Sequence, residues 1–260
     1  MGDEIMVTGH ARELQMKDPR KVRLDYGGKK VWNEIFNHNP RIARYDEEGD
    51  FQIYQARLNG VRPYATAKTI DRWTWCEYKP PIGEIYFQPE ELKFAARHDP
   101  HVVIEPNVKG GASPNKDWGL DRWTHLVQML RAAGLRPVQF GQRGTRRVPG
   151  TDFIETPTFR LAAAVLARAR AAVLHEGGLH HAAAAVGVRA VVIYGGYISP
   201  QQTGYDMHAN LFTGRKPCGM RIPCRHCKRA MQDIPPDMVM GALKRLLDET
   251  SQRACAASTA

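Results

Sequence analysis

The chain has 260 residues and a mass of 29.3 kDa, which is enough for one large domain or two small ones. Hydrophobic residues make up 43% of it, a share that excludes wholesale disorder, and no run of about 18 apolar residues is present to span a membrane. Lysine and arginine number 37 against 27 acidic residues, so the net charge of +10 favours an anionic partner: a nucleotide, a nucleic acid or an acidic membrane surface.

The amino terminus and the cysteine content indicate a cytoplasmic protein. The opening MGDEIMVTGHAREL is acidic at its start and lacks the apolar core of a signal peptide. Five cysteines in 260 residues are too few for a disulfide scaffold. We therefore expect reduced thiols in a cytoplasmic setting.

The amino-terminal part gives an irregular pattern. It predicts, in chain order, a helix over 3–16, a strand over 21–25, a short helix over 31–36, and a strand over 84–87 that runs into a helix from Pro89. Residues 46–83 are polar and aromatic and give no clear prediction. We place a reduced acceptor-side α/β domain at 1–98.

The second part alternates strands with helices. Short apolar, β-branched runs predict strands over 101–105, 135–140, 152–155, 171–174 and 190–194. Helical spacing falls between them: at Trp123, Leu126, Val127 and Leu130 before Gly134, after a capping Thr158, and across Ala182–Ala185. This alternation predicts a parallel, doubly wound sheet in a domain over 99–235. An amphipathic helix over 236–250 follows, which we expect to pack back on the first domain.

Polar loops follow four of these strands. They cover 107–116, 141–144, 175–181 and 195–204, and they are rich in glycine. Because ligands bind beyond the carboxyl ends of the strands in such a sheet, these loops predict a site. Lys116 and the helix that begins after HEGG suit a diphosphate. The alternative is that the glycines only form tight turns.

Several common enzyme motifs are missing. No G-x-G-x-x-G follows a strand, and neither G-x-x-x-x-G-K-[ST] nor G-x-S-x-G occurs. A nicotinamide fingerprint, a phosphate-loop ATPase and a nucleophile-elbow hydrolase are therefore disfavoured.

The remaining motifs resemble family 9 glycosyltransferases, the ADP-heptose:lipopolysaccharide heptosyltransferases and their relatives. The resemblance is carried by K-x-W at residues 116–118, by EGGLHHAAAA at 176–185, by Gly195 and Pro200, by G-D-x-I-x-x-T at 2–8 and by I-P-x-D-x-V at 234–239. It implies a GT-B-like α/β fold, in which two Rossmann-like domains, the amino-terminal one reduced, face a cleft. It also implies an inverting, metal-independent transfer of a sugar, heptose in the family, from a nucleotide diphosphate donor.

The resemblance assigns the base to Asp3, which matches the family's aspartate that takes the proton of the acceptor hydroxyl. The alternative is that Asp3 caps its helix. On the donor side, Lys116 matches the lysine that neutralises the phosphates, and Glu176 replaces the family's aspartate. Gly177 and Gly178 offer backbone amides, and His181 matches the family's histidine. An exposed Lys116 and structural histidines at 180 and 181 are the alternatives.

Three cysteines, Cys218, Cys224 and Cys227, form a C-x5-C-x2-C pattern. The resemblance includes a cysteine cluster in some members, and in some of them it binds a metal. A tetrahedral site needs a fourth ligand, for which His226, Cys76 and Cys255 are candidates, and His226 lies awkwardly between two others. Free, buried thiols are the alternative. We expect no cofactor to be required, and a metal, if bound, to be structural zinc or iron.

Basic clusters at 143–147 and 224–229 suit an anionic glycan or lipid acceptor and a peripheral place at the inner membrane face. A solvated basic face is the alternative. No nucleic-acid module is visible, so nucleic acid is disfavoured. The competing hypothesis to the transferase is an inactive nucleotide-sugar-binding relative or a basic nucleic-acid-associated protein.

Overall fold

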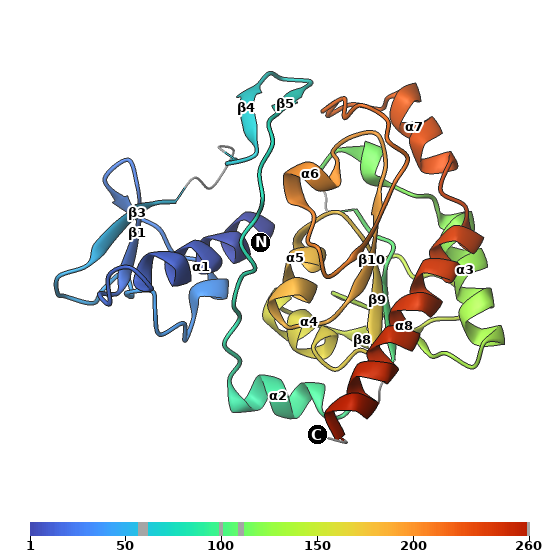
Figure 1. Ribbon diagram of the computed structural model, residues 1–260, viewed down its shortest axis with the longest axis horizontal. Coiled ribbons are helices and arrows are strands. Elements are labelled where there is room, and N and C mark those ends of the chain that lie inside the picture. The colour runs from blue at the N-terminus through green and yellow to red at the C-terminus, as the bar shows by residue number, and fades with distance from the viewer. Residues whose placement is uncertain (57–61, 99–100, 109–111, 259–260) are drawn as a thin grey trace.

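The computed structural model describes residues 1–56, 62–98, 101–108 and 112–258. A six-stranded sheet forms its larger part (Figure 1). The strands are β6 (Val102–Glu105), β7 (Pro137–Gly141), β8 (Asp152–Glu155), β9 (Ala171–His175), β10 (Ala190–Tyr194) and β11 (Ala209–Phe212). Their order is β11-β10-β9-β6-β7-β8, and every neighbouring pair is parallel.

This order confirms the predicted doubly wound sheet. The chain starts in the middle at β6, builds outward to β8, then returns and builds the other half from β9 to β11. Numbered by their own sequence, the strands follow the 3-2-1-4-5-6 order of dinucleotide-binding folds. The order reverses between β6 and β9, and a ligand site is expected at the carboxyl ends of these two strands.

Helices cover both faces of this sheet (Figure 1). On one face lie α4 (Phe159–Leu166) and α5 (Gly178–Ala185), and on the other lie α3 (Leu120–Ala132) and α8 (Pro236–Ser258). Val103 faces the first layer, whereas Val102 and Ile104 face the second. Because both faces are buried, the strands are apolar throughout, which is why the sequence predicts them well.

The last helix differs from expectation in its partners. Helix α8 packs on α3 and on strands β9, β10 and β11, and not on the amino-terminal segment. The reason is its apolar stripe, which includes Val239, Leu243 and Leu246 and joins the same core as Trp123. The helix also runs on to Ser258, beyond the predicted end at 250.

The amino-terminal segment contains a helix and a small sheet. Helix α1 spans Gly2–Gln15, and strands β1 (Val22–Tyr26), β2 (Lys29–Lys30) and β3 (Gln52–Gln55) pair in the order β2-β1-β3. β1 and β3 are parallel, but β2 and a 3-10 turn, rather than an α-helix, lie between them, so the described residues form no second doubly wound sheet. A single 3-10 turn, η1 (Glu34–Phe36), replaces the helix predicted over 31–36.

The strand predicted over 84–87 is wrong. This stretch is extended but pairs with no strand in the described chain, and helix α2 (Pro89–Ala95) follows it as predicted. Its backbone lies against α1 instead: Glu84 N–H donates to the Thr8 hydroxyl at 2.7 Å. A Cβ at Gly83 would lie 2.3 Å from the Ile5 carbonyl oxygen, so only glycine permits this approach. The boundary predicted between 98 and 99 borders residues 99–100, which lie outside the described chain.

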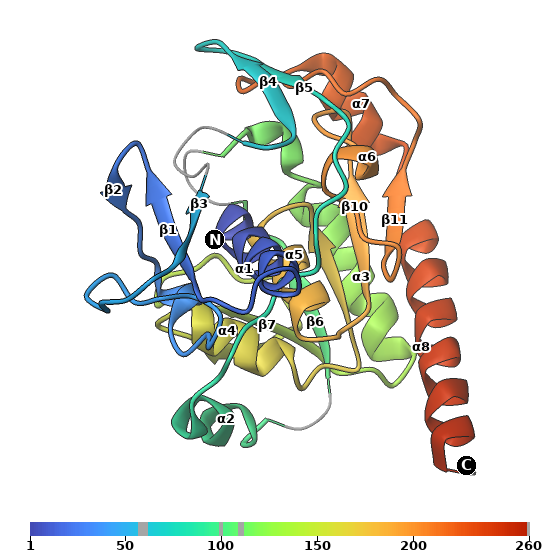
Figure 2. The same ribbon diagram turned by 60° about the vertical axis from the view of Figure 1, so that its left-hand side comes forward.

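A hairpin of β4 (Ala65–Lys68) and β5 (Trp73–Trp75) crosses from the amino-terminal segment to the larger one (Figure 2). It docks on residues 218–221, where Trp73 N–H donates to the Gly219 carbonyl (2.9 Å) and Arg221 N–H donates to the Asp71 carbonyl (2.6 Å). Gly219 has a φ of +66°, and a Cβ there would lie 2.0 Å from the Trp73 oxygen. The hairpin is therefore attached to the carboxyl-terminal half through backbone contacts.

Candidate functional site

Lys116 and Glu176 meet at the point where the strand order reverses. Lys116 ends the turn η2 (Pro114–Lys116) after β6, and Glu176 follows β9 directly. The Lys116 ammonium forms an ion pair with the Glu176 carboxylate and lies 3.4 Å from its carbonyl oxygen. It also lies 5.3 Å from the centre of the Tyr197 ring. The sequence placed both residues in one site, and the fold brings them into contact.

The pair is buried, with 15% of the Lys116 side chain and 5% of the Glu176 side chain exposed. Burial alone would raise the pKa of Glu176, but the Lys116 ammonium outweighs this effect and lowers it. The positive charge of the Lys116 ammonium and the negative charge of the Glu176 carboxylate therefore offset each other in the site. An incoming phosphate would compete with Glu176 for the lysine.

The residues at the start of α5 differ in their hydrogen-bond partners. Gly177 N–H donates to His180 Nδ1 at 2.9 Å, so this amide is already used inside the turn. Gly178 begins the helix, where the first-turn amides lack intrahelical acceptors. His180 and His181 are buried, and burial lowers the pKa of both. His181 accepts or donates one bond with the Tyr205 hydroxyl at 2.7 Å, so the structural alternative describes both histidines well.

Helix α1 brings its first turn against α5 (Figure 2). A Cβ at Gly2 would lie 2.7 Å from His181 Cδ2, so glycine allows the two helices to meet. Asp3 follows on this turn. The N-cap of α1 is Met1, and the Asp3 carboxylate instead accepts a hydrogen bond from the Tyr64 hydroxyl at 2.8 Å. The alternative that Asp3 caps its helix is therefore wrong.

Arg62 and Tyr64 lie between Asp3 and the Lys116–Glu176 pair. Arg62 Nε is 3.7 Å from Asp3 Oδ2, and its guanidinium lies 4.9 Å from the Trp73 ring centre. Burial alone would lower the pKa of Arg62, but Tyr64, Asp3 and Glu176 raise it above its ordinary value. Because Asp3 and Glu176 both act on this guanidinium, the two carboxylates belong to one electrostatic environment.

Sequence reasoning missed Arg62 and Tyr64. They belong to the stretch 46–83, which gives no periodic pattern and no motif. The only signal there is composition: the stretch is rich in aromatic and basic side chains. Glu105, at the end of β6, was missed too. Burial raises its pKa to about 8, and the Asn107 N–H bond (2.8 Å) offsets only part of that effect.

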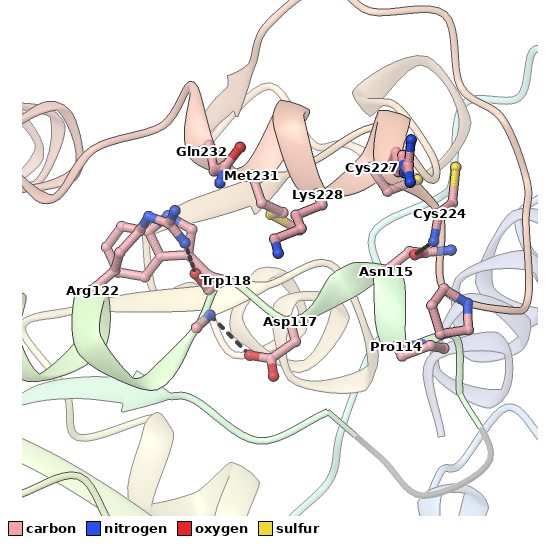
Figure 3. Close-up of a pocket in the computed structure, with 13 residues that line it drawn as sticks. Pro114, Asn115, Asp117, Trp118, Arg122, Cys224, Cys227, Lys228, Met231 and Gln232 are labelled. Carbon is pink, nitrogen blue, oxygen red and sulfur yellow. Dashed lines mark hydrogen bonds between the residues drawn. The ribbon is translucent and has the colours of Figure 1, made fainter.

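A pocket next to the site and a second pocket on the amino-terminal segment are each lined by residues other than Asp3, Lys116 and Glu176. The first, about 410 Å³, lies next to the site between η2, the start of α3 and α7 (Arg225–Gln232) (Figure 3). Asp117, Arg122 and Lys228 project at its edge. The second, about 470 Å³, lies on the small amino-terminal sheet.

The cysteine pattern folds into one cluster. Ligand atoms of Cys218, Cys224, His226 and Cys227 all lie within 4.8 Å of one another. Cys218 Sγ and Cys227 Sγ are 3.1 Å apart, and the Cys227 hydrogen bond lowers the pKa of Cys218 to about 5. Three sulfurs and an imidazole are a set that zinc and iron accept in tetrahedral sites, so these residues fit a metal.

This arrangement corrects the expectation for the fourth ligand. His226 lies with the three cysteines despite its awkward place in the sequence, because Cys224 caps α7 and the turn separates the side chains. Cys76 instead points its thiol to the Pro63 carbonyl at 3.6 Å. The side chain of Cys255 lies outside the described part of the chain.

Comparison with known proteins agrees with these features. The family model for glycosyltransferase family 9 (heptosyltransferase) matches residues 83–233, more than half of the chain. The chain belongs to glycosyltransferase family 9. This matched stretch contains the six strands, Lys116, Glu176 and the cysteine cluster, and it excludes Asp3 and the hairpin. No curated protein matches the chain.

Solved structures of family 9 proteins share its fold. The ADP-heptose lipopolysaccharide heptosyltransferase II of E. coli is 19% identical with a TM-score of 0.51, over 68% of this chain and 56% of that one. A family 9 glycosyltransferase from Veillonella parvula DSM 2008 is 16% identical, with a TM-score of 0.49 over 64% and 54%. The iron-containing dodecameric glycosyltransferase TibC of E. coli H10407 is 17% identical, with a TM-score of 0.48 over 58% and 46%.

This family 9 protein therefore spans about half the length of the structures that it matches. The predicted fold class, an α/β GT-B-like fold with a parallel sheet, is confirmed. No helix in the described part of the chain has the length and apolarity needed to cross a membrane.

Proposed function

We propose that this family 9 protein transfers a sugar, with inversion, from a nucleotide diphosphate donor to a hydroxyl group. The observation that carries the proposal is the Lys116–Glu176 ion pair at the switch point, with the first turn of α1 packed against the start of α5 directly after Glu176. An acidic residue of the amino-terminal segment, Asp3, thus stands on the helix turn that packs next to a buried cation of the larger sheet. General-base transfer with a charged leaving group needs these two elements.

In this proposal the donor diphosphate binds beyond the carboxyl ends of β6 and β9. It replaces Glu176 as the ion-pair partner of the Lys116 ammonium. Glu176 then contacts the sugar, and the free amide of Gly178 faces a phosphate. Asp3 removes the proton of the acceptor hydroxyl as that oxygen bonds to the anomeric carbon. The bond from this carbon to the phosphate oxygen breaks, and Lys116 stabilises the charge that the diphosphate carries away. No catalytic metal is required.

The donor proposed is ADP-linked, with heptose as the sugar, since the solved family 9 structures include TibC bound to ADP-heptose and heptosyltransferase II. The acceptor proposed is an anionic glycan, lipid or protein. The net charge of +10 supports it, as does the tip of the hairpin, where Ile70 is 91% exposed beside Arg72 and Arg221. Such a tip suits a protein of the cytoplasm that works at the inner membrane face.

We also propose that Cys218, Cys224, His226 and Cys227 hold a structural zinc or iron ion. When bound, the ion would cross-link residues 218–227, the segment on which the hairpin docks. Metal analysis of the purified protein should find about one ion per chain, lost in Cys227→Ser and kept in Cys76→Ser, which lies outside the cluster. A metal-free protein with an unchanged melting temperature on adding a chelator would contradict this proposal.

The second candidate is an inactive relative that binds a nucleotide sugar without transferring it, or binds nucleic acid. The buried ion pair favours it, because Lys116 is already paired with Glu176 and a ligand would have to displace that contact. The two candidates differ in turnover. A transferase releases ADP from the donor, whereas a binding protein leaves it intact.

Release of ADP from ADP-heptose tests the proposal. Asp3→Asn should reduce the rate by a factor of about 100 or more, the usual contribution of a general base. Asp206→Asn is the matched control, because Asp206 forms an exposed ion pair with Lys79 away from the site. Equal rates for Asp3→Asn and Asp206→Asn would contradict the role of Asp3.

A further inference from the structure

The two oxygens of the Asp3 carboxylate have different surroundings. Oδ1 accepts the hydrogen bond from the Tyr64 hydroxyl at 2.8 Å. Oδ2 lies 3.7 Å from Arg62 Nε, beyond hydrogen-bond distance. Arg62 Nε is itself buried without a hydrogen-bond partner among the described residues. Among the described residues, one oxygen therefore accepts a hydrogen bond, whereas the other lies near a positive charge and accepts none.

Tyr64 is held rigidly enough to fix Oδ1. Only 3% of the residue is exposed, and its ring packs against Trp75 and Tyr78 with centroids 5.9 and 6.1 Å away. Its backbone carbonyl accepts the Cys76 N–H at 3.0 Å. Burial and the Asp3 charge raise the pKa of Tyr64 well above its usual value, so the hydroxyl keeps its proton and acts as the donor.

Trp75 extends this support to the larger domain. Its indole N–H donates to the Tyr197 carbonyl at 2.7 Å, and Tyr197 lies beside the Lys116 ammonium. A continuous chain of contacts thus leads from the lysine of the switch point to the Asp3 carboxylate. The order of contacts is Lys116, Tyr197, Trp75, Tyr64 and Asp3. One aromatic cluster therefore contacts both the lysine and the aspartate.

We infer that Tyr64 is a positioning residue for sugar transfer, which holds Asp3 by Oδ1 so that Oδ2 takes the acceptor proton. The inference rests on the proposed function of Asp3. In the step, the acceptor O–H bond breaks and its proton moves to Oδ2 while the oxygen bonds to the anomeric carbon. The diphosphate leaves with the electron pair of its bond to that carbon. Arg62 Nε lies 3.7 Å from Oδ2, too far to occupy it with a hydrogen bond.

The test compares Tyr64→Phe with Tyr78→Phe. Both variants lose one hydroxyl from the same aromatic cluster, but the Tyr78 hydroxyl contacts His10 Nε2 (2.6 Å), whereas the Tyr64 hydroxyl contacts Asp3. The probe is ADP-heptose with water as acceptor, followed by ADP release, and ADP affinity and melting temperature are measured alongside. Loss of a hydrogen bond to a charged group predicts a rate about 10-fold lower for Tyr64→Phe.

The expected pattern separates positioning from mere stability. Tyr64→Phe should lower kcat and leave KM for the donor, ADP affinity and the effect on melting temperature equal to those of Tyr78→Phe. In an Asp3→Asn background, Tyr64→Phe should cause no further loss, since the two residues act as one unit. Equal kcat values for the two phenylalanine variants would overturn the inference, as would additive losses with Asp3→Asn.

The outcomes also distinguish the inference from the proposed function. If Asp3→Asn abolishes turnover but Tyr64→Phe does not slow it, only the positioning role falls. If Asp3→Asn keeps full turnover, or the unaltered protein releases no ADP, the proposed function falls and the inference falls with it. Should Tyr64→Phe melt far below Tyr78→Phe, the comparison is made at a temperature where both remain folded.

Discussion

The six-stranded sheet and the amino-terminal segment are built on different principles. In the large sheet, the four inner strands are covered on both faces by apolar side chains. In the amino-terminal segment, the small sheet buries only one face, where Val22 and Leu24 join a core with Ile5, and its hairpin is attached through backbone hydrogen bonds and a glycine that permits close approach. The first region supplies the scaffold for a donor site, and the second supplies the carboxylate that acts on it.

The largest expected effect tests this difference in stability. Trp123 is fully buried between α3 and the sheet and contacts Trp118 and His175. Trp123→Ala should lower the free energy of unfolding by about 3–5 kcal/mol. Ile53→Ala, on the small sheet where Ile53 is 59% exposed, should change it by less than about 0.5 kcal/mol. Urea denaturation followed by circular dichroism measures both, and similar losses would remove the contrast.

A smaller effect tests how the hairpin joins the two regions. Gly219→Ala places a Cβ against the Trp73 carbonyl in a backbone conformation with φ +66°, so the hairpin must move or strain. We expect a loss of about 2–3 kcal/mol in the free energy of unfolding. Gly214→Ala is the control, with a φ of +75° and open space around its Cβ, and should cost about 1 kcal/mol. Equal costs would show that the contact does not hold the hairpin.

The smallest effect, counted per pH unit, tests the Glu105 carboxyl at the switch point. The pKa of Glu105 is raised to about 8 in the folded protein, against 4.5 for the free side chain. Between these values the unfolded chain has lost a proton that the folded chain keeps, so stability falls as pH rises, by at most about 1.4 kcal/mol per pH unit. Glu105→Gln removes this loss. Its melting temperature should match that of the parent near pH 4 and exceed it near pH 8.

The Glu105 prediction has a clear contrary result. Parallel melting curves for the parent and Glu105→Gln across pH 4–8.5 would mean that Glu105 ionises in the folded protein as it does in the unfolded chain. Glu155→Gln, at the exposed end of β8, is the matched control for replacing a carboxyl group by an amide.

The sequence predicted the larger region well because the signals that specify its strands and helices lie within short stretches of the chain. Apolar runs of four or five residues, a Thr158 cap and the helical spacing around Trp123 are visible without knowing their partners, and Lys116 and Glu176 follow from the edge of such a sheet. The strand over 84–87 failed because its backbone partner, Thr8, lies far away in sequence. Contacts between segments far apart in the sequence determine the positions of Arg62, Tyr64 and His226. Such contacts leave no periodic pattern in the sequence, so these positions could not be predicted.

The central claim is that a nucleotide diphosphate binds at the switch point through Lys116. Calorimetric titration with ADP of the parent, Lys116→Ala and Lys79→Ala tests it most directly, because Lys79 also forms an ion pair but on the exposed surface. Loss of a charged contact to phosphate predicts an affinity about 10- to 100-fold weaker for Lys116→Ala and unchanged for Lys79→Ala. Equal affinity in all three proteins, or no binding of ADP by the parent, would contradict the account.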